Sequence, residues 1–246
     1  MEFCLVQDEK RFNGNEEELP VGEKKYIPVI EGNLRSHMVL LPEVIEEVSG
    51  IRIFGKLIKS LVFTTDIAII RNCNANAVMA VYPFTPQPII THALITSSDL
   101  PVFCGVGGGT TTGKRVTSLA EDAEFQGAHG VVVNAPTPNE TLEYLRKKVE
   151  VPIVITVVSE KTDIGKRLES GASILNVSGA EKTPEIVAGI RRDFPKVPII
   201  ATGGNTEESI KRTIDAGANA ITYTPPTNGE IFKDMMNKYR QEKYII

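Results

Sequence analysis

The chain has 246 residues, 41% of them hydrophobic and 24% charged, with a formal net charge of −4. This length suits one β/α barrel or two small domains, while the acidic balance and the absence of Trp disfavour nucleic acid as a partner. No apolar stretch approaches the ~20 residues of a membrane helix, and MEFCLVQDEK lacks the basic, apolar character of a signal peptide. We therefore expect a cytoplasmic protein that contacts neither nucleic acid nor membrane.

Residues 1–59 are expected to form an N-terminal extension, and residues 60–246 a barrel. KYIPVIEG at 25–32 predicts an extra strand, and HMVLLPEVIEEV at 37–48 predicts a helix that Pro42 bends or restarts. We interpret the extension as a cover over the N-terminal end of the barrel or a contact within a homo-oligomer, in preference to a ligand-binding segment.

From residue 60 onward, short apolar runs alternate with amphipathic segments. The runs are rich in Val and Ile and apolar at both alternating positions, as in parallel strands buried on both faces. They lie at 61–65, 77–82, 101–106, 130–134, 152–158, 173–178, 198–204 and 220–224. Between them, spacings of three and four, such as Leu142, Leu145 and Val149, predict helices that cover the sheet.

A repeat inside this alternation indicates how the sheet closes. Gly-Ala steps at 127–128, 171–172 and 217–218 precede alternate runs, and Pro101, Pro152 and Pro198 open the runs between them. The repeat unit is βαβα, and four such units predict an α/β protein with the (β/α)8 TIM-barrel fold. The competing open, doubly wound sheet needs short or polar edge strands, whereas the first and last runs are as apolar as the others.

A glycine pair follows the seventh run, in the segment IIATGGNTEES at 199–209. Gly203, Gly204 and Asn205 stand where a strand ends and a helix begins, and free backbone N–H groups there favour an anion. In barrels a phosphate is often held after strand seven. We predict phosphate binding by these three residues; the alternative is a plain turn.

From Leu61 to Tyr239 the chain resembles the ribulose-phosphate-binding barrel superfamily, through PIIATGG at 198–204 and GANA at 217–220. The resemblance implies phosphosugar epimerase, decarboxylase, synthase or aldolase-like activity. This chain departs from the family by having TYTPPTNGE at 222–230 in place of a phosphate-gripping Gly-Ser or Gly-Thr step, and by lacking the Lys or Asp/Lys pair of aldolases and decarboxylases. It also resembles a group of bacterial barrels labelled only as hydrolases.

A second glycine-rich segment, CGVGGGTTTGKR at 104–115, ends the third run. Gly108 to Lys114 matches GxxxxGK, but Arg115 replaces the Ser or Thr that a nucleotide P-loop needs for magnesium. We interpret it as a mobile loop that closes over the pocket and brings Lys114 to an anionic substrate. A solvated loop without a ligand is the alternative.

Three residues at strand ends are candidates for catalysis. Asp66 and Glu160 follow the first and fifth runs and can transfer protons, although Asp66 also suits a helix cap and Glu160 an exposed loop. Cys104 ends the third run and is a candidate nucleophile, although buried Cys usually only packs. The three Cys and three His show no CxxC or closely spaced ligand pair, so we expect no metal and no cofactor.

Polar residues at other strand ends are expected to orient a substrate. Asn134, Asn176 and Tyr223 end the fourth, sixth and eighth runs, and side chains from alternate strands of a barrel share a layer. Ser178 follows Asn176 at the same rim. The leading hypothesis is an enzyme that acts on a small anionic, phosphorylated metabolite by lyase, isomerase or epimerase chemistry. A hydrolase and a non-catalytic metabolite-binding barrel are the alternatives.

Overall fold

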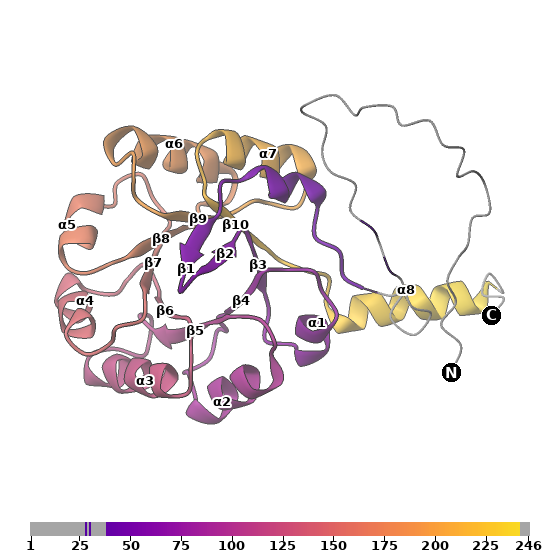
Figure 1. The fold of residues 1–246 in the computed structure, drawn as a ribbon, viewed down its shortest axis with the longest axis horizontal. Coiled ribbons are helices and arrows are strands. Elements are labelled where there is room, and N and C mark those ends of the chain that lie inside the picture. The colour runs from indigo at the N-terminus through magenta and orange to yellow at the C-terminus, as the bar shows by residue number, and fades with distance from the viewer. Residues whose placement is uncertain (1–27, 29, 31–37, 242–246) are drawn as a thin grey trace, which may run out of the picture. The chain divides into compact units, whose positions relative to one another are not determined.

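Eight parallel strands close into a barrel in the order β10-β3-β4-β5-β6-β7-β8-β9 (Figure 1). The computed structural model describes residues 28, 30 and 38–241, so most of the strand predicted at 25–32 lies outside the described residues. Every element described below lies in the compact unit of residues 37–246. The strands are β3 (Ser60–Phe63), β4 (Ala77–Ala80), β5 (Val102–Gly107), β6 (Gly130–Val133), β7 (Ile153–Val157), β8 (Ile174–Val177), β9 (Ile199–Thr202) and β10 (Ala220–Tyr223). Each coincides with one of the predicted runs, and the (β/α)8 fold is confirmed.

Helices follow the strands, and all but the last form an outer ring around the barrel (Figure 1). They are α1 (Ile67–Arg71), α2 (Pro88–Ser97), α3 (Lys114–Phe125), α4 (Asn139–Arg146), α5 (Ile164–Glu169), α6 (Thr183–Asp193), which follows the short 3-10 helix η3 (Ala180–Lys182), α7 (Glu207–Asp215) and α8 (Asn228–Arg240). Leu142 and Leu145 of α4 are fully buried against the sheet, as their spacing predicts. By contrast, α8 has no buried residue.

Side chains alternate between the barrel interior and the layer under the helices. The interior contains Phe103 and Val154, which belong to one apolar cluster with residues from the other strands. The neighbouring positions, such as Cys104 and Ile155, belong to a second cluster together with helix residues. This alternation fixes which strand-end side chains face a ligand in the barrel and which face a helix.

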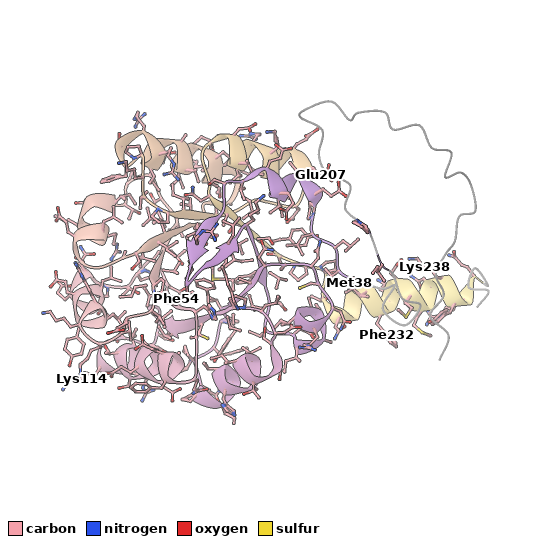
Figure 2. All side chains as sticks on the ribbon, viewed as in Figure 1. Met38, Phe54, Lys114, Glu207, Phe232 and Lys238 are labelled. Carbon is pink, nitrogen blue, oxygen red and sulfur yellow. The ribbon has the colours of Figure 1, made fainter. Side chains whose placement is uncertain are left out.

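A β-hairpin closes the N-terminal end of the barrel. It consists of β1 (Ile51–Ile53) and β2 (Lys56–Ile58), joined by Phe54 and Gly55, which both have positive φ angles of 46° and 82°. Ile53 and Ile58 belong to the interior cluster of the barrel, and the Phe54 ring lies 6.0 Å from that of His129, just before β6. Figure 2 shows Phe54 over the middle of the barrel. A two-residue loop containing Gly between apolar runs is the sequence signal for such a hairpin.

A helix is predicted over residues 37–48, but in residues 38–48 the structure contains only one short helical turn. The segment begins with a bridge between Val39 and Cys73, and only the 3-10 helix η2 (Glu43–Glu47) follows. Pro42 explains the difference, because a proline disfavours helical backbone in the residue before it. Ile45 of η2 is 1% exposed and packs with the outer cluster, and Glu47 forms a 2.8 Å ion pair with Lys211 of α7.

Candidate active site at the barrel mouth

Polar side chains line the barrel interior at the C-terminal ends of the strands. Asn176 and Thr222 each lie two residues beyond an interior residue, Ile174 and Ala220, so they point to the same face. The Asn176 amide donates to Thr156 Oγ1 over 3.3 Å. Asn176 Oδ1 and Thr222 Oγ1 are buried and have no hydrogen-bond partner among the described residues. An unpaired buried polar group costs about 1–3 kcal/mol, so these atoms suit a bound polar ligand or water.

The three strand-end residues predicted to share a layer do not all face the mouth. Asn134 lines a pocket at this end of the barrel, and Asn176 faces the interior. Tyr223 is partly buried against the outer cluster instead, because it is one residue past Thr222 and alternation turns it outward. Thr222 therefore takes the interior position that the sequence analysis assigned to Tyr223, and strict use of the alternation would have identified it.

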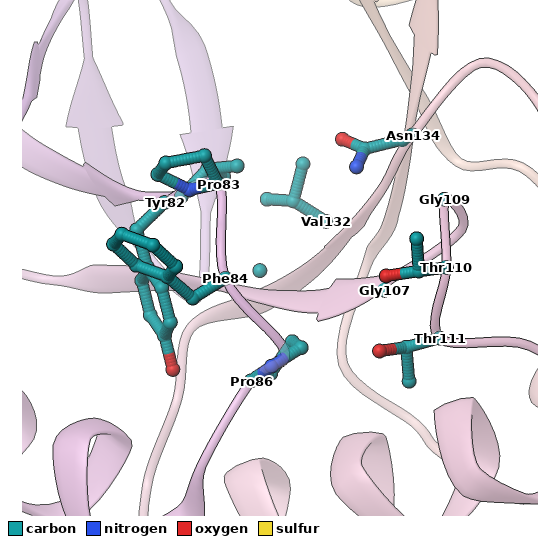
Figure 3. A pocket seen from close by; sticks show the side chains of 12 residues that line it. Tyr82, Pro83, Phe84, Pro86, Gly107, Gly109, Thr110, Thr111, Val132 and Asn134 are labelled. Carbon is teal, nitrogen blue, oxygen red and sulfur yellow. The ribbon is translucent and has the colours of Figure 1, made fainter.

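A pocket of about 250 Å³ opens where β4, β5 and β6 end. Figure 3 shows the rings of Tyr82 and Phe84 on one side and Thr110, Thr111 and Asn134 on the other. Tyr82 is held by its hydroxyl oxygen, which accepts a 2.9 Å hydrogen bond from the Gln87 amide. Except for Asn134, these residues were not among the predicted site residues, although the glycine-rich segment at 104–115 supplies two of them.

The Gly-Gly loop after β9 has the backbone that the sequence predicts. Gly204 has a φ angle of +83°, and a Cβ there would lie 2.4 Å from Ser209 Oγ. Thr206 caps α7 by accepting a 3.2 Å hydrogen bond from the Ser209 amide, which leaves the Gly204 and Asn205 amides without a partner among the described residues. Glu207 and Glu208 occupy the first turn of α7. Phosphate binding at Gly203, Gly204 and Asn205 stays a prediction.

The loop after β10 closes its own helix end. Thr227 caps α8, and the Glu230 carboxylate accepts a 2.8 Å hydrogen bond from the Thr227 amide. That bond lowers the pKa of Glu230 from its ordinary value, so the carboxylate stays charged. A fixed negative charge at this helix end disfavours an anion there.

Asp66 lies at the mouth, at the end of β3, and caps α1. Its Oδ1 accepts hydrogen bonds from the Ala68 and Ile69 amides at 2.8 and 3.3 Å. The capping role foreseen for Asp66 is confirmed. Its Oδ2 makes no hydrogen bond or ion pair with a described residue. Proton transfer by Asp66 stays a prediction.

The other predicted site residues lie apart from the pocket. Glu160 is exposed and lines a groove between α5 and α6 on the outside of the barrel. Lys114 begins α3, and Figure 2 shows it at the outer edge of the ring. Ser178 is half-buried at the end of β8, where its amide donates to Val157 O over 2.9 Å. Of the predicted substrate-binding set, Asn134 lines the pocket and Asn176 faces the barrel interior.

Cys104 is not accessible from the mouth. Its side chain belongs to the outer cluster and is 2% exposed. Burial raises the pKa of its thiol to about 12, and thiolate is the nucleophilic form. This burial under the helices disfavours the predicted role of Cys104 as a nucleophile; Gly105, the next residue, faces the pocket in its place.

Residues 38–241 contain no group of three or more His, Cys, Asp or Glu side chains arranged to hold a metal ion. In the same residues no helix combines the length and apolar character needed to cross a bilayer.

Comparisons with known proteins extend the description of the fold. The sequence matches no family profile and no curated protein. Among solved structures, it is similar to a provisionally assigned phosphonomutase from Burkholderia cenocepacia J2315, with a TM-score of 0.59, 14% identity, and coverage of 78% of this chain and 94% of that one. These likenesses establish the fold alone.

Two further structures have the same barrel. Phosphonopyruvate hydrolase, in complex with oxalate and Mg²⁺, has a TM-score of 0.56 and 10% identity over 74% of this chain and 82% of its own. The 2,3-dimethylmalate lyase, described as a member of the PEP mutase/isocitrate lyase superfamily, has a TM-score of 0.54 and 12% identity over 81% and 85% of the two chains. All three are described as enzymes: a mutase, a hydrolase and a lyase.

Proposed function

We propose that this chain is a barrel enzyme that binds a small phosphorylated metabolite at the mouth and acts on it by lyase, isomerase or epimerase chemistry. The observation that carries the proposal is the pair of buried, unpaired oxygens, Asn176 Oδ1 and Thr222 Oγ1, inside the mouth. Because leaving such groups unpaired is costly, a polar ligand that bonds to them would lower that cost.

The phosphate of this ligand is assigned to the loop after β9. The backbone amides of Gly204 and Asn205 donate no hydrogen bond to another described residue. Thr222 stabilises the same loop, because its backbone carbonyl accepts a 3.5 Å hydrogen bond from the Gly203 amide. The resemblance of the sequence to ribulose-phosphate-binding barrels supports phosphate as the anion. The enzymes with this fold described above support action on a small anionic substrate.

Asp66 is the residue to which we assign proton transfer. Its Oδ1 is occupied by the start of α1, so the carboxylate has a fixed position, and its Oδ2 faces no described partner. Asn134 and Asn176 would orient the substrate through their amides. A carboxylate held in this way can take a proton from carbon or oxygen and return it to another atom.

Thermal unfolding with inorganic phosphate and a panel of sugar phosphates tests the proposal. A ligand at a hundred times its dissociation constant adds about 2.7 kcal/mol to the free energy of unfolding. Asn205→Asp places a negative charge in the phosphate loop without adding bulk and should abolish the shift, whereas Asn237→Asp makes the same change on the exposed face of α8 and should keep it. Equal shifts in both variants, or none in the native protein, would sink the proposal.

A non-catalytic metabolite-binding barrel is the second candidate. It is favoured by one observation: of the three predicted catalytic residues, Cys104 is buried and Glu160 lies outside, which leaves Asp66 alone at the mouth. Incubation of the protein with each stabilising ligand, followed by NMR of the ligand, separates the two. Conversion that stops in Asp66→Ser, a variant that keeps a helix cap, supports an enzyme; unchanged ligand supports a binding protein.

A further inference from the structure

The pocket at the ends of β4, β5 and β6 has an aromatic wall with nothing stacked on it. Tyr82 and Phe84 form this wall together with Pro86, and Figure 3 shows the rings lining the cavity. Phe84 is 75% exposed. Aromatic rings of this kind gain most from covering the face of another planar group, because that contact removes apolar area from water.

The opposite wall offers hydrogen bonds that the protein does not use. Thr111 is 5% exposed, and its hydroxyl, which Figure 3 shows turned toward the cavity, has no hydrogen-bond partner among the described residues. The Asn134 side-chain amide is likewise without a partner in that part of the chain. An amide presents one donor and one acceptor side by side, which matches the N–H and C=O edge of a heterocycle.

The size and charge of the pocket narrow the class of group that fits. Its volume of about 250 Å³ is below the roughly 300–1,000 Å³ of pockets that enclose a whole ligand, so it receives part of a molecule. Its lining contains no Asp, Glu, Lys, Arg or His. A single uncharged ring therefore fits better than a second phosphate or a carboxylate.

We infer that this pocket binds an uncharged, one-ring nitrogen heterocycle of the pyrimidine type, stacked on Phe84 and bonded by Thr111 and Asn134. In the closed order of strands, β5 and β6 lie across the barrel from β9 and β10, so ring and phosphate would occupy opposite sides of one mouth. The inference rests on the proposed function for the phosphate half. Together they describe the ligand as a phosphorylated compound that carries a heterocycle, and not a bare sugar phosphate.

Calorimetric titrations with ribose 5-phosphate, uridine and uridine 5′-monophosphate test this directly. Base stacking on an aromatic ring is worth roughly tenfold in affinity, so the nucleotide should bind at least about ten times more tightly than ribose 5-phosphate. Phe84→Ala and Thr111→Val should remove that gain and leave ribose 5-phosphate binding unchanged. Thr112→Val, the same change at the exposed neighbour, is the matched control and should keep the gain.

A variant that fills the pocket provides a second test that does not depend on removing buried side chains. Gly109 lines the pocket, and a Cβ there would meet only Asn134 Nδ2, at 4.0 Å. Gly109→Val should therefore fold normally, exclude the ring and bind ribose 5-phosphate as before. Equal affinities for nucleotide and sugar phosphate would overturn the inference. Uridine binding with no gain from phosphate would overturn the proposed phosphate loop and support the ring pocket, and no binding of any compound would overturn both.

Discussion

Replacing Thr222 by Val gives opposite outcomes for folding and for ligand binding. The side chain is 4% exposed and its hydroxyl has no partner among the described residues. Because an unpaired buried hydroxyl costs about 1–3 kcal/mol, a methyl group in its place should raise the free energy of unfolding by about 1 kcal/mol or more. For a domain of this size, each kcal/mol corresponds to about 2–4 °C in Tm.

Ligand binding should change in the other direction. A lost hydrogen bond of about 0.5–1.5 kcal/mol weakens the affinity for a sugar phosphate by about 2- to 13-fold. Differential scanning calorimetry of the native protein and Thr222→Val, each with and without ribose 5-phosphate, measures both effects. Thr213→Val is a useful comparison, because that buried hydroxyl donates to Ser209 O over 2.9 Å and its loss should lower Tm. A lower Tm in Thr222→Val together with unchanged affinity would show that the hydroxyl serves the fold and not a ligand.

Three further predictions follow from single side chains. Asp66→Ala should lower the free energy of unfolding by about 1 kcal/mol through loss of the α1 cap, and Asp66→Ser should recover most of it in urea titrations. Burial lowers the pKa of His129 below its ordinary 6.5, and the nearby Lys56 lowers it further. As the pH falls, the unfolded chain therefore takes up this proton before the folded chain does, and the free energy of unfolding should decrease below about pH 6.5. This decrease should be smaller in His129→Gln. Cys104, with a thiol pKa of about 12, should react with a thiol reagent only on unfolding; reaction at the rate of free cysteine would contradict its burial.

The regular part of the fold is readable from the sequence because each strand and helix carries its own pattern. Runs such as 152–158 are apolar at successive positions, and only parallel strands covered on both sides need that. The structure of residues 38–58 is harder to predict from the sequence. Pro42 interrupts a helical pattern there, and the hairpin depends on positive φ angles at Phe54 and Gly55.

The site was less predictable because it depends on which way each side chain turns. Tyr223 ends β10 and Cys104 lies within β5, and alternation places both under helices. Glu160 follows β7 and emerges on the outer surface, in the groove between α5 and α6. The sequence predicts a loop at 104–115 that closes over the pocket, but no sequence pattern shows that the Thr111 hydroxyl turns toward the cavity without a hydrogen-bond partner among the described residues.

The segment of residues 41–50, whose helix η2 packs against α7, also affects how the chain folds. Asn219 accepts a 2.8 Å hydrogen bond from the Gly50 amide and donates one of 2.9 Å to Ser49 Oγ, across 170 residues in the second case. Such distant contacts form late and slow the folding of a domain. During synthesis, η2 leaves the ribosome long before α7 and β10, so its contacts with α7 form only when the chain is almost complete. A chaperone that holds this early segment would therefore be expected to raise the yield of the folded barrel.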